Sequence, residues 1–204
     1  MDGARAGVVL WFTGLPSSGK STIARRVESI LLRRGLPVEL LDGHEVRQSL
    51  SRGLGFSRED REEHVRRIGY VAKLLSRNGV IAVCAAVSPY RATRDEIRSR
   101  VTNFVEIYVD CPLEVAESRD PDGMYARARA GEIEDFTGIS DPYEPPEQPE
   151  VHIFSDRESV DSAAAKVVKT LELLGLIPPG NGRDGLAVPD EEELRWRLAG
   201  LGYL

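Results

Sequence analysis

Residues 7–22, GVVLWFTGLPSSGKST, decide the fold of this chain. Gly7 to Thr13 is a continuous apolar run, which is typical of a strand buried on both faces of a parallel sheet. The next residues satisfy the pattern G-x-x-x-x-G-K-[ST], whose glycines let backbone N–H groups curl inward around phosphate oxygens. An amphipathic helical pattern follows this loop. A strand, a loop and a helix in this order predict a nucleoside triphosphate site.

The side chains of this loop have distinct expected roles. Lys20 is expected to reach the β- and γ-phosphates, and the Ser21 hydroxyl to bind Mg²⁺. The helix that begins near Gly19 adds its positive N-terminal end. We therefore predict that ATP contacts the whole loop: Gly14, Leu15, Pro16, Ser17, Ser18, Gly19, Lys20, Ser21 and Thr22.

Outside the loop, apolar runs alternate with helical patterns. Four further strands are expected, at residues 37–41, 80–87, 104–109 and 151–154, and long helices at 57–78 and 159–174. Ser57 is expected to cap the first of these helices, and Ser88-Pro89 fits a helix cap followed by proline at the first helical position. The alternation predicts an α/β fold of the P-loop kinase type, with a parallel central sheet flanked by helices on both faces.

Composition limits the class of protein. The chain has 204 residues, 27 Lys and Arg against 33 Asp and Glu, and a net charge of -6, which disfavours a general nucleic-acid binder. The longest apolar run, 80–87, is too short for a membrane span, and no secretory signal is expected. Cys84 and Cys111 indicate no disulfide framework. We predict a cytoplasmic protein without membrane or nucleic-acid partners.

Two regions interrupt the rhythm of strands and helices. Residues 119–150 hold charges and glycines, and we expect them to form a mobile lid. Residues 178–189, PPGNGRDGLAVP, have the composition of a linker. They lead to an amphipathic tail with Leu194, Leu198 and Leu201 on one face. Residues 1–177 are thus expected to form the kinase-like domain, and the tail to dock on it, contact a partner or fray, with docking favoured over disorder.

The acceptor side of a kinase needs a carboxylate near a strand end. Asp42 ends the second strand, and it fits either a metal or base role or the cap of the following helix. Arg47 fits an anion contact or a solvated helix residue. No N-K-x-D guanine motif is found, so a small-molecule kinase is favoured over a GTPase.

Several stretches together resemble one known family, adenylylsulfate kinase (APS kinase). They include Gly14–Thr22, Leu41–Arg47, Leu54–Ser57, Ser88–Arg91, ARAGEI at 128–133 and FTGI at 136–139. The resemblance spans about residues 8–174 and implies transfer of the ATP γ-phosphate to the 3′-hydroxyl of adenosine 5′-phosphosulfate (APS), which gives PAPS and ADP in sulfate activation. It also implies Mg²⁺, a homodimer and a possible ATP sulfurylase partner.

The resemblance also implies roles for single residues. Arg47 and Arg61 would grip the sulfate and phosphate end of APS, because guanidinium groups suit multi-oxygen anions. Phe56 and Phe136 would sandwich the acceptor adenine. Arg119 would face the ATP adenine, and closure of the lid would bring its arginines to the phosphates and exclude water. The lid arginines are Arg127 and Arg129.

Catalytic roles are implied for Lys20, Asp42 and Ser88. Asp42 would both contact the substrate and bind the metal together with Ser21. Ser88 matches the serine that the family marks as an active-site residue, historically described as a phosphoserine intermediate. Its alternative role is the helix cap before Pro89, with its backbone N–H positioning the acceptor.

The chain departs from the family pattern at several positions. His44 replaces a second aspartate, and Glu45 stands where the family has asparagine. His64 takes the place of an asparagine beside the acceptor, and Asp122 and Ala126 replace lid lysines. An imidazole can accept a proton but is a poor ligand for Mg²⁺. His44 is therefore an uncertain catalytic candidate.

Three hypotheses follow from these residues. The first is an active APS kinase with a rearranged base, and the loop together with Asp42, Arg47, Phe56, Arg61 and Phe136 favours it. The second is a kinase of another hydroxylated small molecule, which His44, His64 and Asp122 favour. The third is a non-catalytic nucleotide-binding partner of a sulfurylase.

Overall fold

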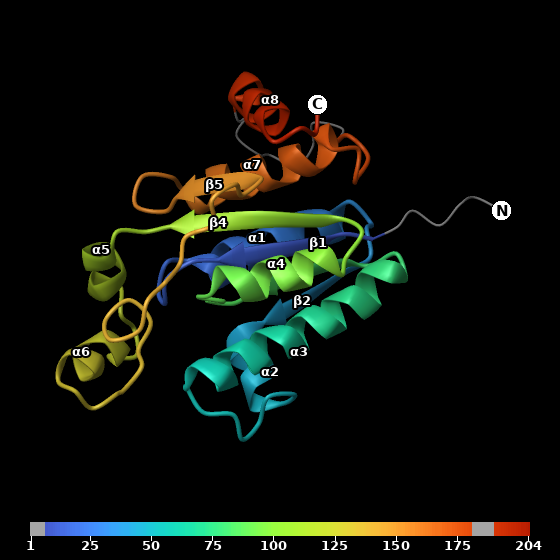
Figure 1. Cartoon of the computed structure of the whole chain (residues 1–204). Coiled ribbons are helices and arrows are strands. Elements are labelled where there is room, and N and C mark those ends of the chain that lie inside the picture. Colours follow the sequence, from blue (N-terminus) through green and yellow to red (C-terminus); the bar gives the residue numbers. More distant parts are fainter. Residues whose placement is uncertain (1–6, 181–189) are drawn as a thin grey trace.

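A five-stranded parallel sheet forms the centre of the protein (Figure 1). The computed structural model describes residues 7–180 and 190–204. The strands are β1 (Val9–Thr13), β2 (Val38–Asp42), β3 (Ile81–Ala85), β4 (Phe104–Asp110) and β5 (Val151–Phe154), in the order β2-β3-β1-β4-β5. Every strand pair is parallel, so the expected sheet is confirmed.

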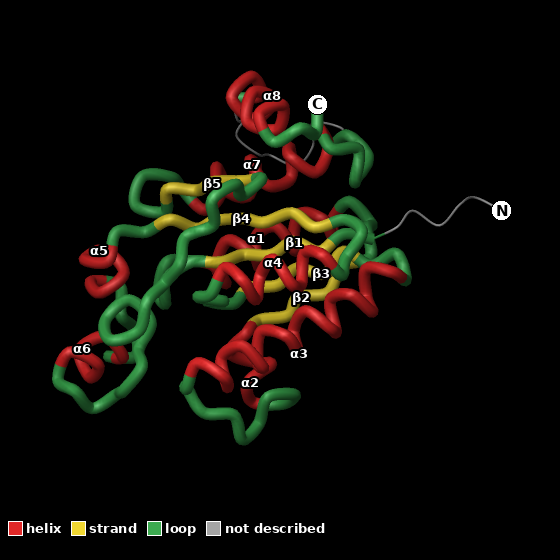
Figure 2. The backbone as a smooth tube through the Cα atoms, viewed as in Figure 1, coloured by secondary structure: helices red, strands yellow, loops and turns green. Residues whose placement is uncertain are grey.

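Helices cover both faces of the sheet (Figure 2). Alternate residues of β1 point to opposite sides: Leu10 and Phe12 pack with one pair of helices, and Val9 and Trp11 with the other. The first pair is α1 (Lys20–Arg33) and α7 (Val160–Leu173), and the second is α3 (Arg58–Arg77) and α4 (Arg91–Ser99). The remaining helices are α2 (Gly43–Gln48), α5 (Leu113–Ser118), α6 (Met124–Arg129) and α8 (Glu191–Gly200).

The place of β1 explains where a ligand can enter. β1 lies between β3 and β4, so the chain leaves β1 and β3 toward helices on opposite faces of the sheet. Such a switch point opens a crevice at the carboxyl ends of the strands. The glycine-rich loop follows β1 directly and therefore lies at this crevice. The ribbon in Figure 1 shows α5 and α6 beyond the same end of the strands.

The predicted helix start at Ser88-Pro89 is wrong. Tyr90 is the N-cap, and α4 begins at Arg91. Ser88 has a φ of 40°, outside the extended region that an N-cap adopts, and its hydroxyl is held by the side chains of Trp11 and Thr13. By contrast, Ser57 caps α3 as expected, since its hydroxyl accepts from the Asp60 N–H at 3.2 Å.

The C-terminal tail packs on the sheet domain. Leu194 and Leu198 of α8 are 5% and 0% exposed, and Lys169 of α7 pairs with Glu191 at 2.7 Å. Of the three expectations for the tail, the structure therefore shows docking of residues 190–204 on the sheet domain. Residues 181–189 of the expected linker lie outside the described residues. The division at residue 177 and the mobility of the lid stay predictions.

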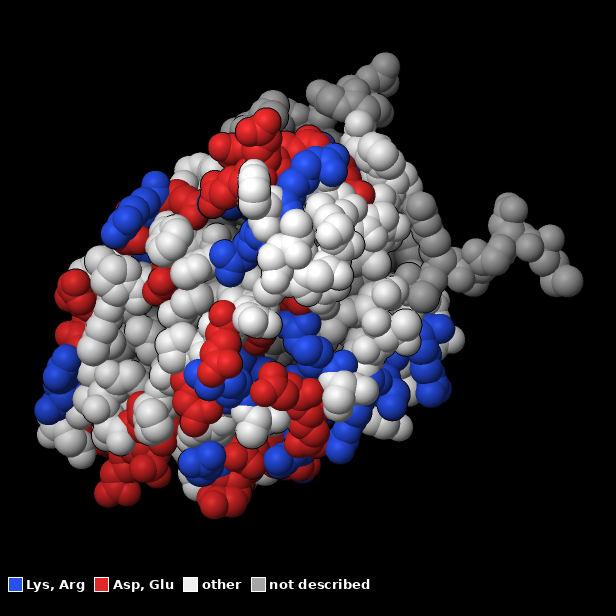
Figure 3. All heavy atoms as spheres, turned by 45° about the horizontal axis from the view of Figure 1, so that its top comes forward, with Lys and Arg blue, Asp and Glu red and all other residues white. Residues whose placement is uncertain are grey.

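Charges are mixed on the surface around this tail. Figure 3 turns the upper side of Figure 1 forward and shows acidic and basic side chains interspersed on that face. Among residues 7–180 and 190–204, no helix combines the length and the apolar character that crossing a bilayer requires.

Candidate active site

The loop after β1 has a backbone that only certain residues tolerate. Gly14 has a φ of 152°, and a Cβ there would lie 2.4 Å from the Val109 carbonyl oxygen of β4. Gly19 has a φ of 98° and Ser17 a φ of 58°, both in the left-handed region. Close contact with β4 thus requires glycine at 14, and the two positive φ values turn the loop before α1 begins.

Lys20 lies buried beneath this loop. Its Nζ donates to the Leu15 carbonyl at 2.6 Å and lies 3.4 Å from the Ser18 hydroxyl. Burial lowers the pKa of Lys20 to about 8, although the charges of Asp42 and Cys111 act in the opposite direction. An ammonium group removed from water in this way is stabilised by any anion that enters the loop.

A cavity of about 550 Å³ opens beside the loop. Arg119 borders it and donates to the Ser155 carbonyl at 2.7 Å, so its guanidinium is fixed against the chain that follows β5. Of the predicted ATP contacts, Arg119 and residues 17–22 line this cavity, whereas residues 14–16 do not, and sequence reasoning missed the rest of the wall. The missed residues are Ile23, Pro121, Ser155, Glu158, Ser159 and Val160. The position of 155–160 after a predicted parallel strand was the signal that could have found most of them.

Asp42 takes the helix-cap role, and its metal or base role stays a prediction. It is the N-cap of α2, and its Oδ1 accepts from the His44 N–H at 3.0 Å. Its Oδ2 pairs with Arg25 of α1 at 3.1 Å, an ion pair that sequence reasoning missed. The His44 ring lies elsewhere: it is exposed, and its Nε2 is 3.0 Å from Gln48 Nε2. Both oxygens of the buried Asp42 carboxylate therefore have partners within the chain, and the His44 ring is not one of them.

Ser88 sits at the carboxyl end of β3 and is 2% exposed. Its hydroxyl accepts from Trp11 Nε1 at 3.0 Å and donates to the Thr13 hydroxyl at 3.0 Å. The strained φ of this residue and these two contacts fix the turn. Its hydroxyl is thus a buried structural group in this state, and its predicted catalytic role remains a prediction.

Arg61 joins the two segments that carry the predicted adenine-stacking rings. Its Nε donates to the Phe56 carbonyl at 2.8 Å, its Nη1 donates to the Thr137 hydroxyl at 2.9 Å, and its Nη2 donates to the Asp135 carbonyl. Phe56 is 47% exposed, whereas Phe136 is 6% exposed and packs edge-on against Tyr125. The two segments therefore lie together, and stacking of the two rings on an adenine stays a prediction.

Arg47 and His64 complete this side of the site. Arg47 donates to the Gly55 carbonyl at 2.8 Å, and its guanidinium lies 4.7 Å from the centre of the Phe56 ring. His64 is buried, with Nδ1 2.8 Å from the Ser51 hydroxyl. Burial, with the nearby charge of Arg47, lowers the pKa of His64 to about 4. His64 is therefore a neutral hydrogen-bonding group near pH 7.

The expected lid touches the phosphate loop. Tyr125 of α6 donates to the Pro16 carbonyl at 2.9 Å, a contact that sequence reasoning did not find. The predicted lid arginines instead pair with neighbouring carboxylates: Arg127 with Glu132 at 3.2 Å and Arg129 with Glu117 at 2.6 Å. Both ion pairs are exposed, so they cost little to exchange for a phosphate.

Comparisons with known proteins agree with this geometry. Residues 6–154 match the family model described as Adenylylsulphate kinase. An "Adenylyl-sulfate kinase" of Halothermothrix orenii is 53% identical over 171 residues, which cover 84% of this chain and 92% of that protein.

Two solved structures are also similar. A Mycobacterium tuberculosis APS kinase, CysC, in complex with AMPPNP and APS has a TM-score of 0.79 and 42% identity, covering 82% of this chain and 99% of that one. A hexameric APS kinase from Thiobacillus denitrificans has a TM-score of 0.67 and 36% identity, covering 87% of this chain and 31% of that one. These similarities agree with the parallel sheet and the phosphate loop. We conclude that this chain belongs to the adenylylsulfate kinase family.

Proposed function

We propose that this protein transfers the γ-phosphate of ATP to the 3′-hydroxyl of APS, giving PAPS and ADP. The observation that carries the proposal is the pairing of two features at one edge of the sheet. One is the phosphate loop with its buried Lys20, and the other is Arg61, which holds the Phe56 segment against residues 135–137. A nucleoside triphosphate fits the first feature, and a second, anionic nucleotide fits the second.

Each residue has a role in this reaction that its surroundings support. Lys20 binds the β- and γ-phosphates, because their negative charge replaces the hydration that burial removed. On the acceptor side, Arg47 and Arg61 bind the phosphosulfate, and the Phe56 and Phe136 rings stack on the adenine. Closure of the lid over both nucleotides excludes water, which limits ATP hydrolysis.

Ser21 and Asp42 fit a magnesium ion. A hydroxyl and a buried carboxylate are hard oxygen ligands, and Mg²⁺ commonly takes one or two of these together with phosphate oxygens and water. When bound, the ion neutralises charge on the transferring phosphoryl group. Asp42 would exchange part of its contact with Arg25 for this ligand, since Arg25 is exposed.

His44 and Ser88 have secondary roles in this proposal. Phosphoryl transfer depends mainly on positioning and on neutralising charge, so the acceptor hydroxyl needs little help from a base. The exposed His44 ring is therefore not required as a catalytic base. The Ser88 turn positions the acceptor through its backbone.

Assembly and location are part of the same proposal. We expect the chain to form a homodimer, and the hexameric relative from T. denitrificans supports association of copies in this family. Light scattering coupled to gel filtration measures this directly, and a monomer at micromolar concentration contradicts it. An ATP sulfurylase partner and a cytoplasmic location remain predictions, the latter supported by two free, buried cysteines.

An ADP-release assay with and without APS tests the reaction. We expect turnover that requires APS and gives PAPS, with Lys20→Met as the inactive control. ATP turnover that other hydroxylated molecules stimulate, but APS does not, would favour a changed acceptor. Tight ATP binding without turnover on any acceptor would favour a non-catalytic nucleotide-binding module.

A further inference from the structure

Four charged side chains form a chain of ion pairs between α4, β4 and the segment before β5. Arg94 Nε contacts Glu106 at 2.8 Å, the other oxygen of Glu106 contacts Arg98 at 3.2 Å, and Arg98 contacts Glu150 at 2.6 Å. We call these residues the buried ion network. The side chains of Arg94, Glu106 and Glu150 are 1%, 8% and 2% exposed. The Arg98 side chain is 30% exposed and forms the outer part of the network. The charges balance, and the three buried groups depend on their neighbours because they have lost most of their hydration.

The inner end of the network holds the acceptor side of the site. Arg94 Nη1 donates to the Ser88 carbonyl at 2.6 Å, and its Nη2 donates to the Glu144 carbonyl at 2.7 Å. Glu144 belongs to residues 142–150, the last part of the expected lid, which leads to β5 and which we call the return segment. One guanidinium therefore fixes both the strained Ser88 turn and the end of the lid.

The return segment has further anchors along its length. The Tyr143 hydroxyl lies 2.9 Å from the Thr13 hydroxyl, and the Glu144 N–H donates to the Pro89 carbonyl at 2.8 Å. At its far end, Glu150 Oε2 accepts from the Glu106 backbone N–H at 2.6 Å. These contacts tie the return segment to the sheet domain, so the predicted motion of the lid would be confined to residues 119–141.

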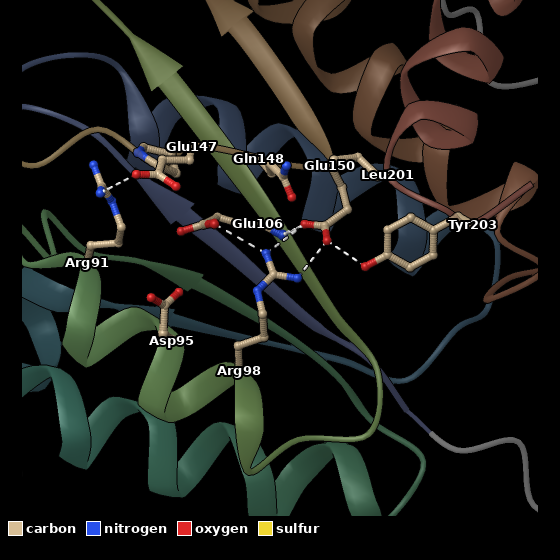
Figure 4. Close-up of a pocket in the computed structure, with 10 residues that line it drawn as sticks. Arg91, Asp95, Arg98, Glu106, Glu147, Gln148, Glu150, Leu201 and Tyr203 are labelled. Atoms are coloured by element: carbon tan, nitrogen blue, oxygen red, sulfur yellow. Dashed lines mark hydrogen bonds and ion pairs between the residues drawn. The ribbon is translucent and has the colours of Figure 1, made fainter.

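The outer end of the network is closed by the C-terminal tail (Figure 4). The Tyr203 hydroxyl donates to Glu150 Oε1 at 2.6 Å, the same oxygen that Arg98 contacts. Leu201 and Tyr203 also line a cavity of about 260 Å³ over the network. Nearby, Arg197 Nε donates to the Pro149 carbonyl at 2.9 Å. The tail thus binds the last two residues of the return segment, Pro149 and Glu150, through hydrogen bonds.

We propose that Tyr203 is a positioning residue for the acceptor side of the site, acting through the buried ion network on the Ser88 turn and the return segment. The tail lies beyond residues 6–154, which match the family, so this chain supplies the contact from its own extension. The kinetic part rests on the proposed function. The physical reason is that the Tyr203 hydroxyl donates to the Glu150 carboxylate, which is 2% exposed, and a buried network whose polar groups all have partners holds one geometry.

Tyr203→Phe in the full chain tests the proposal, because it removes one oxygen and keeps the ring. Hydrogen–deuterium exchange should rise about three-fold or more in residues 86–90 and 142–150 and stay unchanged elsewhere. KM for APS should rise several-fold while KM for ATP stays constant, because the ATP cavity has other walls. Trp196→Phe is the matched control: this tail residue is 79% exposed, and we expect no change in exchange or kinetics.

Each outcome decides between distinct conclusions. If hydrogen–deuterium exchange of Tyr203→Phe is unchanged in residues 86–90 and 142–150, the proposal is overturned whatever the kinetics. If exchange rises throughout the chain, the tail has only a structural role, which also overturns the proposal. Exchange that rises as expected while KM for APS stays constant overturns the positioning role. Because exchange needs no turnover, a chain that is inactive with APS contradicts the proposed function and still leaves exchange to test the link from Tyr203 to the Ser88 turn.

Discussion

The donor and acceptor sides of the site are built in different ways. The phosphate-binding part of the donor side is a single stretch, residues 14–22, in which backbone conformation and one buried lysine form the surface, although the rest of the cavity wall comes from distant segments. The acceptor side collects side chains from α2, α3, the turn after β3 and the loop at 135–137. A local motif can therefore survive changes elsewhere in the chain, whereas the acceptor side depends on packing and on contacts such as those of Arg61.

The largest expected effect tests the donor side. Lys20→Met should lower turnover about 10³-fold, because it removes a charge that is fixed against the transferring phosphate. Without nucleotide, the free energy of unfolding should rise, since an ammonium group with a pKa lowered to about 8 is buried unfavourably. Steady-state kinetics and urea unfolding measure both changes. Lys73→Met on α3 is the control; equal losses in both variants would contradict the role of Lys20.

The second prediction tests the acceptor side. Arg61→Lys should raise KM for APS about 10- to 100-fold and change KM for ATP much less, because a single ammonium group cannot make the three contacts of the guanidinium. Arg67→Lys on the same helix is the control, as Arg67 pairs with Glu63 at the surface. A comparable rise in KM for both nucleotides would show that the two sides are not separable.

The third prediction concerns pH and His64. The native pKa is lowered to about 4, so between pH 6.5 and about 4 the unfolded chain binds a proton that the native chain does not. Stability contributed by the neutral ring is thus present above pH 6.5 and lost as the pH falls through this window. When the pH falls from 7 to 5, the free energy of unfolding should decrease in the unmodified protein by about 2 kcal/mol more than it decreases in the His64→Asn variant. Equal losses in urea unfolding would contradict the shift.

The smallest effect is expected at His44. His44→Asp should preserve or raise APS-dependent turnover, because the ring is exposed and a carboxylate is favourable in the first turn of α2. Initial rates at saturating ATP and APS measure this change, with Gln48→Ala as the control for the lost ring contact. A large loss of turnover in the aspartate variant alone would mean that the imidazole has its own role.

Two features of the acceptor side could not be predicted from local patterns. Ser88-Pro89 has the residue types of a helix start, yet Trp11, which is far away in sequence, takes the Ser88 hydroxyl. Likewise, the Arg25 partner of Asp42 lies in a different helix, and no spacing rule connects the two. In both cases a tertiary contact competes with the local preference and prevails, because a buried polar group must find a partner.

The sequence by itself determined the parallel sheet, the phosphate loop and the family, because apolar runs, glycine positions and short motifs act over a few residues. Only the tertiary structure decided how Arg61 joins two segments, where the wall of the ATP cavity runs and what the tail contacts. These features depend on side chains that meet across large separations in the chain, as Tyr203 meets Glu150. Such long-range contacts follow from the packing of the whole domain, and short-range sequence patterns do not predict them.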